Sequence, residues 1–165
     1  MRKEFKHVDD FYEAVDEPSQ REVIDGGRVY VTPAGSVYPS ITSILGRQPK
    51  PGIEEWRKKV GAEEANRIMK ESSELGTMVH NLCEQYLYNL PLKCDYPDEA
   101  ISVFNRLRFI LGNVDNIYGL ELPLYSDILK VAGTVDCVAE YNGVLSVIDF
   151  KTSRKAKRED WIEDY

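Results

Sequence analysis

The dipeptide Asn142-Gly143, set between two runs of apolar and β-branched residues, constrains the fold more than any other feature of the sequence. Asn-Gly in this setting is a strong signal for a two-residue hairpin, because both residues accept the positive φ angles of a type I′ turn. Such a turn pairs Tyr141 with Val144 and sets the register of both strands. The sequence therefore predicts an antiparallel hairpin over residues 129–152.

Counting outward from this turn separates the two faces of the hairpin. One face is almost wholly apolar and is expected to pack on the core. On the other face Asp136 falls across from Asp149, and Lys151 lies two residues further along. Carboxylates facing each other at Cβ separations of about 4.5–5.5 Å repel. A divalent cation between them removes the conflict; the alternative is a solvated strand face on which two acids happen to align.

Helices precede the sheet along the chain. The helical spacing of Phe104, Leu107 and Leu111 indicates a helix with one core face. The expected elements are a hairpin over 28–38, a short helix over 41–45 with Ser40 as N-cap, two helices over 53–90 divided near 72–76, a helix from 97 to about 112, strands over 117–125, 129–141 and 144–152, and a new helix over 159–165. This order predicts an α+β fold in which helices flank a mixed sheet.

Two regions of different character are expected. Residues 1–27 are acidic and weakly patterned, which favours a loosely ordered N-terminal arm. Residues 28–165 have the length of a single domain, mainly helical over 28–112 and mainly sheet over 113–165.

Charge, hydropathy and cysteine usage narrow the function. The net charge of −7 argues against a protein that coats nucleic acid by bulk attraction. No apolar run approaches the roughly 20 residues of a membrane span, and the N-terminus lacks a secretory pattern, so an intracellular protein without membrane partners is expected. Cys83, Cys94 and Cys137 show no CxxC spacing and are expected to be reduced thiols.

The segment GTMVHNLCEQYL places His80 and Glu84 on one face of a helix, four residues apart. Gly76, one turn earlier, leaves room for close backbone approach. A lone helical histidine is more often structural than a metal ligand. Glu84 by itself is better explained as a surface acid or a hydrogen-bonding partner than as a metal ligand.

The tripeptide Asp149-Phe150-Lys151 combines a carboxylate able to bind a metal with a positively charged lysine. Residues i and i+2 of a strand point the same way, so one carboxylate and one ammonium meet the same phosphate. The carboxylate suits Mg²⁺ or Mn²⁺, which take oxygen ligands. The lysine can orient the attacking water or help to deprotonate it. The pattern predicts metal-assisted hydrolysis of a phosphodiester.

The ordered set of GTMVH with a glutamate four residues after its histidine, GLELPL, GTVD and IDFKTS resembles the RecB-like branch of the PD-(D/E)XK nucleases. With YPSITSIL and WRKK upstream, it is similar to mitochondrial genome maintenance exonucleases and related phage exonucleases. The resemblance covers roughly residues 28–165. It implies a restriction-endonuclease-like core with an N-terminal helical extension, and a cytoplasmic or host-cell location if the chain is phage-encoded.

The resemblance also implies roles for individual residues. His80, Asp136 and Asp149, with the backbone carbonyl of Phe150, are expected to bind Mg²⁺ or Mn²⁺, and Lys151 is the expected catalytic lysine. Three further residues have supporting roles. They are Glu121, which binds a second cation or is simply a glutamate at the rim, and Glu84 and Thr152, which support the ligands from behind.

The expected partner is DNA, in single-stranded form. A basic groove that follows phosphates, with aromatic side chains that stack on bases, is typical of such binding. The candidate residues are Trp56, Arg57, Lys58, Lys59, Arg154 and Lys155. Trp56 as a core anchor of its own helix is the alternative.

One departure from the family pattern bears on activity. RecB-like members carry a Q-x-x-x-Y motif on the helix after the lysine, whereas this sequence stops at Tyr165. We therefore expect the C-terminal part of the core to be missing. The predicted function is a metal-dependent DNA exonuclease of repair or recombination. The alternatives are a truncated, non-catalytic DNA-binding module and an endonuclease of the same fold.

Overall fold

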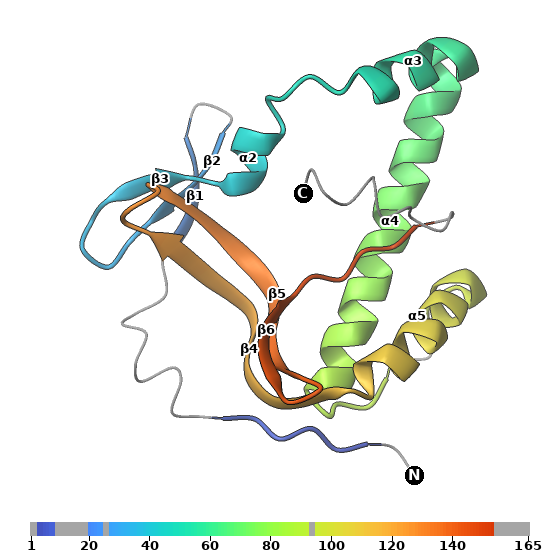
Figure 1. The fold of residues 1–165 in the computed structure, drawn as a ribbon. Coiled ribbons are helices and arrows are strands. Elements are labelled where there is room, and N and C mark those ends of the chain that lie inside the picture. The colour runs from blue at the N-terminus through green and yellow to red at the C-terminus, as the bar shows by residue number, and fades with distance from the viewer. Residues whose placement is uncertain (1–2, 9–19, 25–26, 93–94, 154–165) are drawn as a thin grey trace.

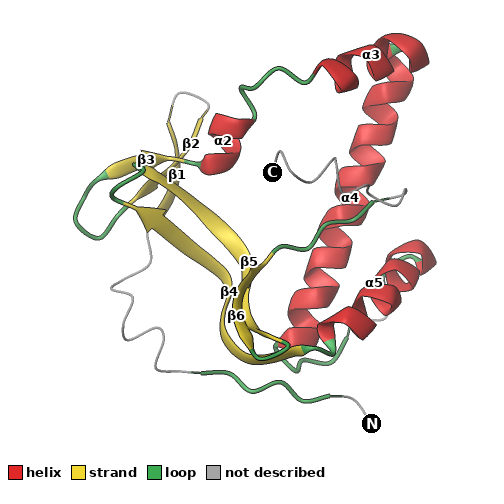
Figure 2. Cartoon of the chain, viewed as in Figure 1, coloured by secondary structure: helices red, strands yellow, loops and turns green. Residues whose placement is uncertain are grey.

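A computed structural model describes residues 3–8, 20–24, 27–92 and 95–153 of the chain (Figure 1). Strands occupy the two ends of this range and helices its centre (Figure 2). The elements in chain order are β1 (Gln20–Ile24), β2 (Gly27–Val31), β3 (Val37–Pro39), α2 (Ile41–Leu45), α3 (Pro51–Val60), α4 (Ala62–Leu87), α5 (Asp98–Leu111), β4 (Val114–Ser126), β5 (Val131–Tyr141) and β6 (Val144–Ile148).

The predicted α+β class is confirmed. The described strands form two three-stranded antiparallel sheets, of order β1-β2-β3 and β4-β5-β6. Parallel pairing occurs as single bridges, from His7 to Ile117 and from Ser40 to Ala132. We call β1-β2-β3 the small sheet and β4-β5-β6, which has the longer strands, the large sheet. The second bridge joins the small sheet to β5 of the large sheet, where Tyr30 Oη also lies 3.0 Å from Thr134 Oγ1. The arrangement is consistent with a nuclease-like α/β core.

The hairpin register predicted from Asn-Gly is confirmed. Pairing runs from Tyr141–Val144 at the turn to Cys137–Ile148 at the far end. Both turn residues have positive φ, 51° at Asn142 and 76° at Gly143. The last strand is shorter than predicted: β6 ends at Ile148 rather than at residue 152. The Asp-Phe-Lys tripeptide therefore follows the strand instead of ending it.

Helix α4 packs on the face of the large sheet that was predicted to be apolar, and α5 lies beside α4 (Figure 1). Cys137 and Ala139 of β5 are fully buried there, together with Val79 and Cys83 of α4. Phe104 of α5 completes this part of the core at 2% exposure. The sheet face and the helix stripe therefore form one hydrophobic core.

The predicted division of the long helical region near residues 72–76 is wrong. Helix α4 runs unbroken for 26 residues, and the break falls at Gly61, where φ is 89° and ψ is 150°. Few residues other than glycine adopt that backbone conformation. Through the predicted break, Thr77 Oγ1 donates to the Ser73 carbonyl, so a hydroxyl that favours turns is satisfied within the helix.

The loosely ordered arm predicted for residues 1–27 also needs correction where the chain is described. Strand β1 pairs with β2 over its whole length. Residues 3–8 lie against the large sheet and the end of α4. Phe5 is 4% exposed, and its ring meets Tyr86 edge to face at 5.1 Å. The side-chain amide of Asn89 accepts a hydrogen bond from the Phe5 N–H and donates one to the Phe5 carbonyl, each at 2.8 Å. A single buried aromatic ring carries no periodic signal in the sequence.

Two further expectations concern a C-terminal helix and membrane-spanning helices. The helix expected over 159–165 lies outside the described residues. Within them, no helix combines the length and the hydrophobicity that crossing a bilayer requires.

Candidate metal centre

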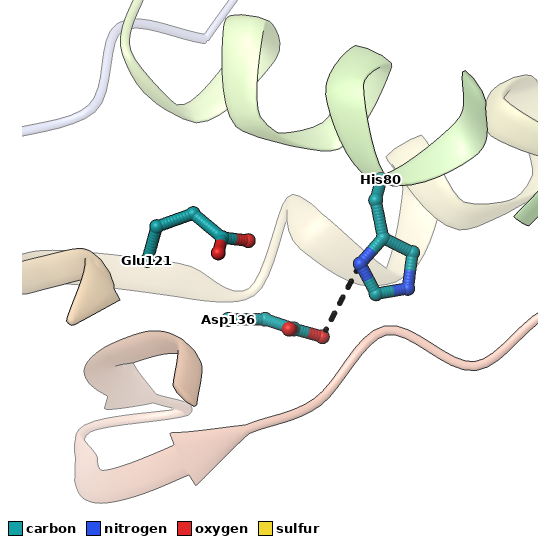
Figure 3. A group of neighbouring side chains, drawn as sticks. All are labelled: His80, Glu121 and Asp136. Carbon is teal, nitrogen blue, oxygen red and sulfur yellow. Dashed lines mark ion pairs between the residues drawn. The ribbon is translucent and has the colours of Figure 1, made fainter. Parts of the chain in front are cut away.

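Three potential metal ligands converge from three different elements (Figure 3). His80 comes from α4, Glu121 from β4 and Asp136 from β5, and one ligand atom of each lies within 4.8 Å of the other two. His80 Nδ1 is 3.6 Å from Asp136 Oδ2. The side chain of His80 is 31% exposed and that of Asp136 is 14% exposed. Glu121 is exposed, so the group is open to solvent on the side of Glu121.

Strand register brings the two carboxylates together. Leu120 pairs with Cys137 and Leu122 with Val135, so Glu121 falls directly across from Asp136. The flanking leucines are buried. Glu121 itself has a φ of 49°, in the left-handed region that side chains other than glycine rarely adopt. Backbone strain of this kind concentrates at functional sites.

Electrostatics at Glu121 reflect this crowding of acids. Partial burial raises the pKa of its carboxyl group, the charges of Asp136 and Glu84 raise it further, and His80 opposes the shift. Burial raises the pKa of the Cys83 and Cys137 thiols to about 12, with a smaller contribution from Asp136. The two thiols are therefore protonated at neutral pH and are poor ligands for a cation.

The peptide unit of Phe150, two residues after β6, is hydrogen-bonded to two residues of this cluster. Its N–H donates to Asp136 Oδ2 at 2.6 Å, and its carbonyl accepts a hydrogen bond from His80 Nε2. The Phe150 ring is buried, and it meets the imidazole of His80 edge to face at 5.7 Å. The carbonyl predicted as a metal ligand thus lies beside the other candidate ligands.

Asp149 and Lys151 are placed outside the three-residue cluster. They form an ion pair with each other at 2.7 Å, and both side chains are 54% exposed. Asp149 was expected directly across from Asp136, but the ladder stops one pair earlier, at Ile148. Two facing carboxylates repel, and Asp136 accepts the Phe150 N–H in place of a cross-strand neighbour.

The two expected supporting residues lie on opposite sides of His80. Glu84 follows one turn later on α4 and is close enough to raise the pKa of Glu121. Thr152 follows the lysine and faces Gly76 of α4. A Cβ built on that glycine would meet Thr152 Oγ1 at 3.5 Å, an ordinary van der Waals distance.

The expected DNA-binding residues on α3 lie away from the cluster. The Arg57 guanidinium donates hydrogen bonds to Asn66 Oδ1 at 2.7 Å and to Met69 Sδ at 3.3 Å. It therefore links α3 to α4. Trp56 is partly buried, whereas Lys58 and Lys59 are exposed. Asn66 precedes His80 by about 20 Å of helix, at 1.5 Å per residue. The other predicted contacts, Arg154 and Lys155, lie outside the described residues.

Sequence reasoning missed two parts of this geometry. Glu121 was only a loose candidate, because its place opposite Asp136 depends on the β4–β5 register, which has irregularities between Asp115 and Gly119. The bond from the Phe150 N–H to the Asp136 carboxylate was not expected at all. The segment GLELPL was the available signal for Glu121, because it places an acid between two leucines in a predicted strand.

Comparisons with known proteins point in one direction. No family model matches the chain. It is 31% identical over 130 residues to mitochondrial genome maintenance exonuclease 1 of Mus musculus, 30% identical over 134 residues to that of Xenopus tropicalis and 29% identical over 132 residues to that of Homo sapiens. The matches cover 72%, 75% and 74% of this chain and 38% of each relative. These relatives support an exonuclease family for the chain.

Proposed function

We propose that this chain is a metal-dependent DNA exonuclease of the PD-(D/E)XK type, which hydrolyses phosphodiester bonds at single-stranded ends. The observation that carries the proposal is the convergence of His80, Glu121 and Asp136 beside the Asp-Phe-Lys segment. Relatives named exonucleases support the same reaction class. Because the chain spans 38% of their length, the activity and the substrate are part of the proposal.

The residues present fit a divalent cation. Two carboxylates and one imidazole, with ligand atoms within 4.8 Å of one another, form a donor set suited to Mg²⁺ or Mn²⁺. Partial burial raises the pKa of Glu121, and the charges of Asp136 and Glu84 raise it further, so a cation would offset an accumulation of negative charge here. His80, Glu121 and Asp136 would hold the cation, with the Phe150 carbonyl and Asp149 as further oxygen donors. When bound, the cation would supply charge neutralisation at the phosphate and acidify a water molecule.

The chain's own residues account for orientation and proton handling. Lys151 Nζ, held by Asp149 at 2.7 Å, is exposed to an incoming phosphate. The ammonium orients a water molecule for attack on phosphorus and offsets the negative charge that develops there. The water oxygen bonds to phosphorus, the bond from phosphorus to the departing oxygen breaks, one water proton passes to solvent, and the departing oxygen takes a proton from solvent. Phe150 keeps the segment in place through Asp136 and His80.

The Lys151→Ala variant tests the proposal. With end-labelled linear single-stranded DNA in Mg²⁺ or Mn²⁺, we expect the variant to lose about 10²–10³-fold of the cleavage rate, the usual cost of removing one donor that stabilises developing charge. EDTA should abolish cleavage by the unaltered chain. Lys70→Ala is the matched control, because Lys70 is a solvent-exposed lysine whose ion pair, within the described part of the chain, is with Glu74 at 3.9 Å. Equal cleavage by the Lys151→Ala variant and the unaltered chain would refute the assignment.

Three nucleic acids separate this proposal from its alternatives. A closed circular single strand has no ends, so its cleavage identifies an endonuclease. Binding of linear DNA in Mg²⁺ without turnover, at high protein concentration, identifies a non-catalytic binding module. An RNA strand of the same sequence, tested in parallel, shows whether DNA is the preferred substrate.

A further inference from the structure

A pocket of about 300 Å³ lies next to the Asp-Phe-Lys segment and is not used by the proposed metal centre. Helix α4 contributes Ser72 and Leu75 to its wall, and the chain after Lys151 contributes Thr152 and Ser153. The remaining described wall belongs to α5. The pocket therefore opens within one residue of the proposed catalytic lysine.

Helix α5 lines this pocket with a single stripe of four residues, Glu99, Ser102, Val103 and Arg106. Their spacing of three, four and seven residues places them on one helix face. Seven residues correspond to about 10 Å of helix, so the carboxylate and the guanidinium lie at opposite ends of the stripe. The pocket thus has an acidic end, a basic end and hydroxyl groups between them.

The charges at the two ends are available to a ligand. Among the described residues, neither Glu99 nor Arg106 has an ion-pair partner within 4.0 Å. Leu75 is 8% exposed and Val103 is partly buried, so both give the wall an apolar surface. A guanidinium with nearby hydroxyls is suited to a phosphate, and an apolar wall is suited to a sugar or a base.

We propose that this pocket binds one nucleotide at the end of the DNA strand, with its phosphate at Arg106. The hydroxyls of Ser102 and Thr152 donate to the phosphate oxygens, and Leu75 and Val103 contact the sugar and base. The Glu99 carboxylate accepts a hydrogen bond from an N–H of the base, as glutamate does from cytosine N4. The identity of the strand rests on the proposed function, whereas the nucleotide site rests on the pocket itself.

The first test measures binding without cleavage. In EDTA, ¹H–¹⁵N NMR titration with dCMP should shift the amide signals of Ser102, Arg106 and Thr152. The Arg106→Gln variant should bind dCMP about tenfold more weakly, because it loses a charge-assisted phosphate contact. Arg108→Gln is the matched control: it removes the same charge from the same helix, outside the pocket. Ser102→Ala, a smaller change, should weaken binding in the same direction.

Two probes identify what the pocket recognises. Deoxycytidine, which lacks the phosphate, should bind at least about tenfold more weakly than dCMP if the Arg106 contact supplies the energy of one charge-assisted bond. Inorganic phosphate should also bind more weakly than dCMP, because it cannot use the apolar wall. Equal binding of inorganic phosphate and dCMP would overturn the nucleotide proposal. Equal weakening by Arg106→Gln and Arg108→Gln would overturn it too, because it would indicate general attraction to a basic helix.

The second test uses cleavage and separates this inference from the proposed function. Single-stranded oligonucleotides with a terminal phosphate at the 5′ end, at the 3′ end or at neither are compared in Mg²⁺. Arg106→Gln should raise KM about tenfold for one phosphorylated end and leave kcat unchanged. Absence of cleavage with Arg106-dependent dCMP binding would refute the nuclease and keep the pocket. Cleavage that Arg106→Gln leaves unchanged would refute the pocket and keep the nuclease.

Discussion

At Glu121, both the backbone and the side chain occupy unfavourable states. The φ angle of 49° is unusual for a residue with a Cβ atom, and the carboxylate faces that of Asp136 across the strand pair. Partial burial raises the pKa of Glu121, and the negative charges of Asp136 and Glu84 raise it further. A residue that destabilises its own strand in this way is expected to be retained for what it binds.

The Glu121→Gln substitution should therefore stabilise the metal-free protein and weaken its binding of Mn²⁺. A carboxyl group whose pKa is raised on folding opposes folding above its ordinary pKa of 4.5, where the unfolded chain is ionised. We expect the free energy of unfolding at pH 7 in EDTA to rise by about 0.2–1 kcal/mol, the size of a cross-strand charge contact. The gain should shrink as the pH falls toward 4.

Urea unfolding at pH 7 and pH 4 measures the first effect, and Mn²⁺ titration followed by electron paramagnetic resonance measures the second. Glu140→Gln is the control on the same sheet, because Glu140 is satisfied by Asn116 and Tyr118. Destabilisation by Glu121→Gln at both pH values, with Mn²⁺ binding unchanged, would contradict the assignment of Glu121 as a ligand.

At the scale of elements, α4 links the helical part of the chain to the metal centre. The helix contacts α3 near its start (Figure 1). It carries His80 and the apolar stripe further along. Two glycines, one just before α4 and one within it, have opposite roles. Gly61 ends the preceding helix with a φ of 89°, whereas Gly76 lies inside the helix and leaves its neighbours at ordinary distances.

Alanine at these two positions should shift stability in opposite directions. Gly76→Ala should raise the free energy of unfolding by about 0.5–1 kcal/mol, because alanine loses less backbone entropy in a helix. Gly61→Ala should lower it by about 1–3 kcal/mol through backbone strain. Thermal and urea unfolding of both variants provide the measurement. A destabilised Gly76→Ala variant would show that Thr152 needs the space beside the glycine.

At the scale of the whole molecule, residues 3–8 connect the large sheet with the end of α4. They contact the last turn of α4 and the edge of β4, segments 80 or more residues away along the chain. Val8 N–H donates to the Ile117 carbonyl and Ile117 N–H to the Lys6 carbonyl, each at 2.8 Å. His7 Nε2 lies 2.9 Å from the Leu87 carbonyl. The N-terminal segment therefore stabilises the end of the helix that carries His80.

Removal of the Phe5 ring should destabilise the whole protein. Phe5→Ala empties a site that is 4% exposed, at a cost of about 3 kcal/mol. Val23→Ala on β1 is the control, because that side chain is 70% exposed and its loss should cost less than about 0.5 kcal/mol. Chemical unfolding of both variants gives the comparison. Equal stabilities would show that the segment is dispensable.

The predictability of the elements follows the range of their interactions. The β5–β6 register depends on a two-residue turn, so the Asn-Gly signal was sufficient to predict it. The helix from Asp98 to Leu111 follows from apolar spacing and an acidic first turn. The break at Gly61 was missed, because an isolated glycine shows its φ angle only in the folded backbone.

The sequence by itself determined the hairpin, the α+β order and the set of residues able to bind a cation, because these depend on local turn geometry, periodicity and side-chain chemistry. Only the tertiary structure decided which candidates meet. It set Glu121 across from Asp136 through a strand pair with two register shifts. It left Asp149 paired with Lys151 outside the cluster. Contacts between distant segments are selected by packing of the whole core, which no local pattern encodes.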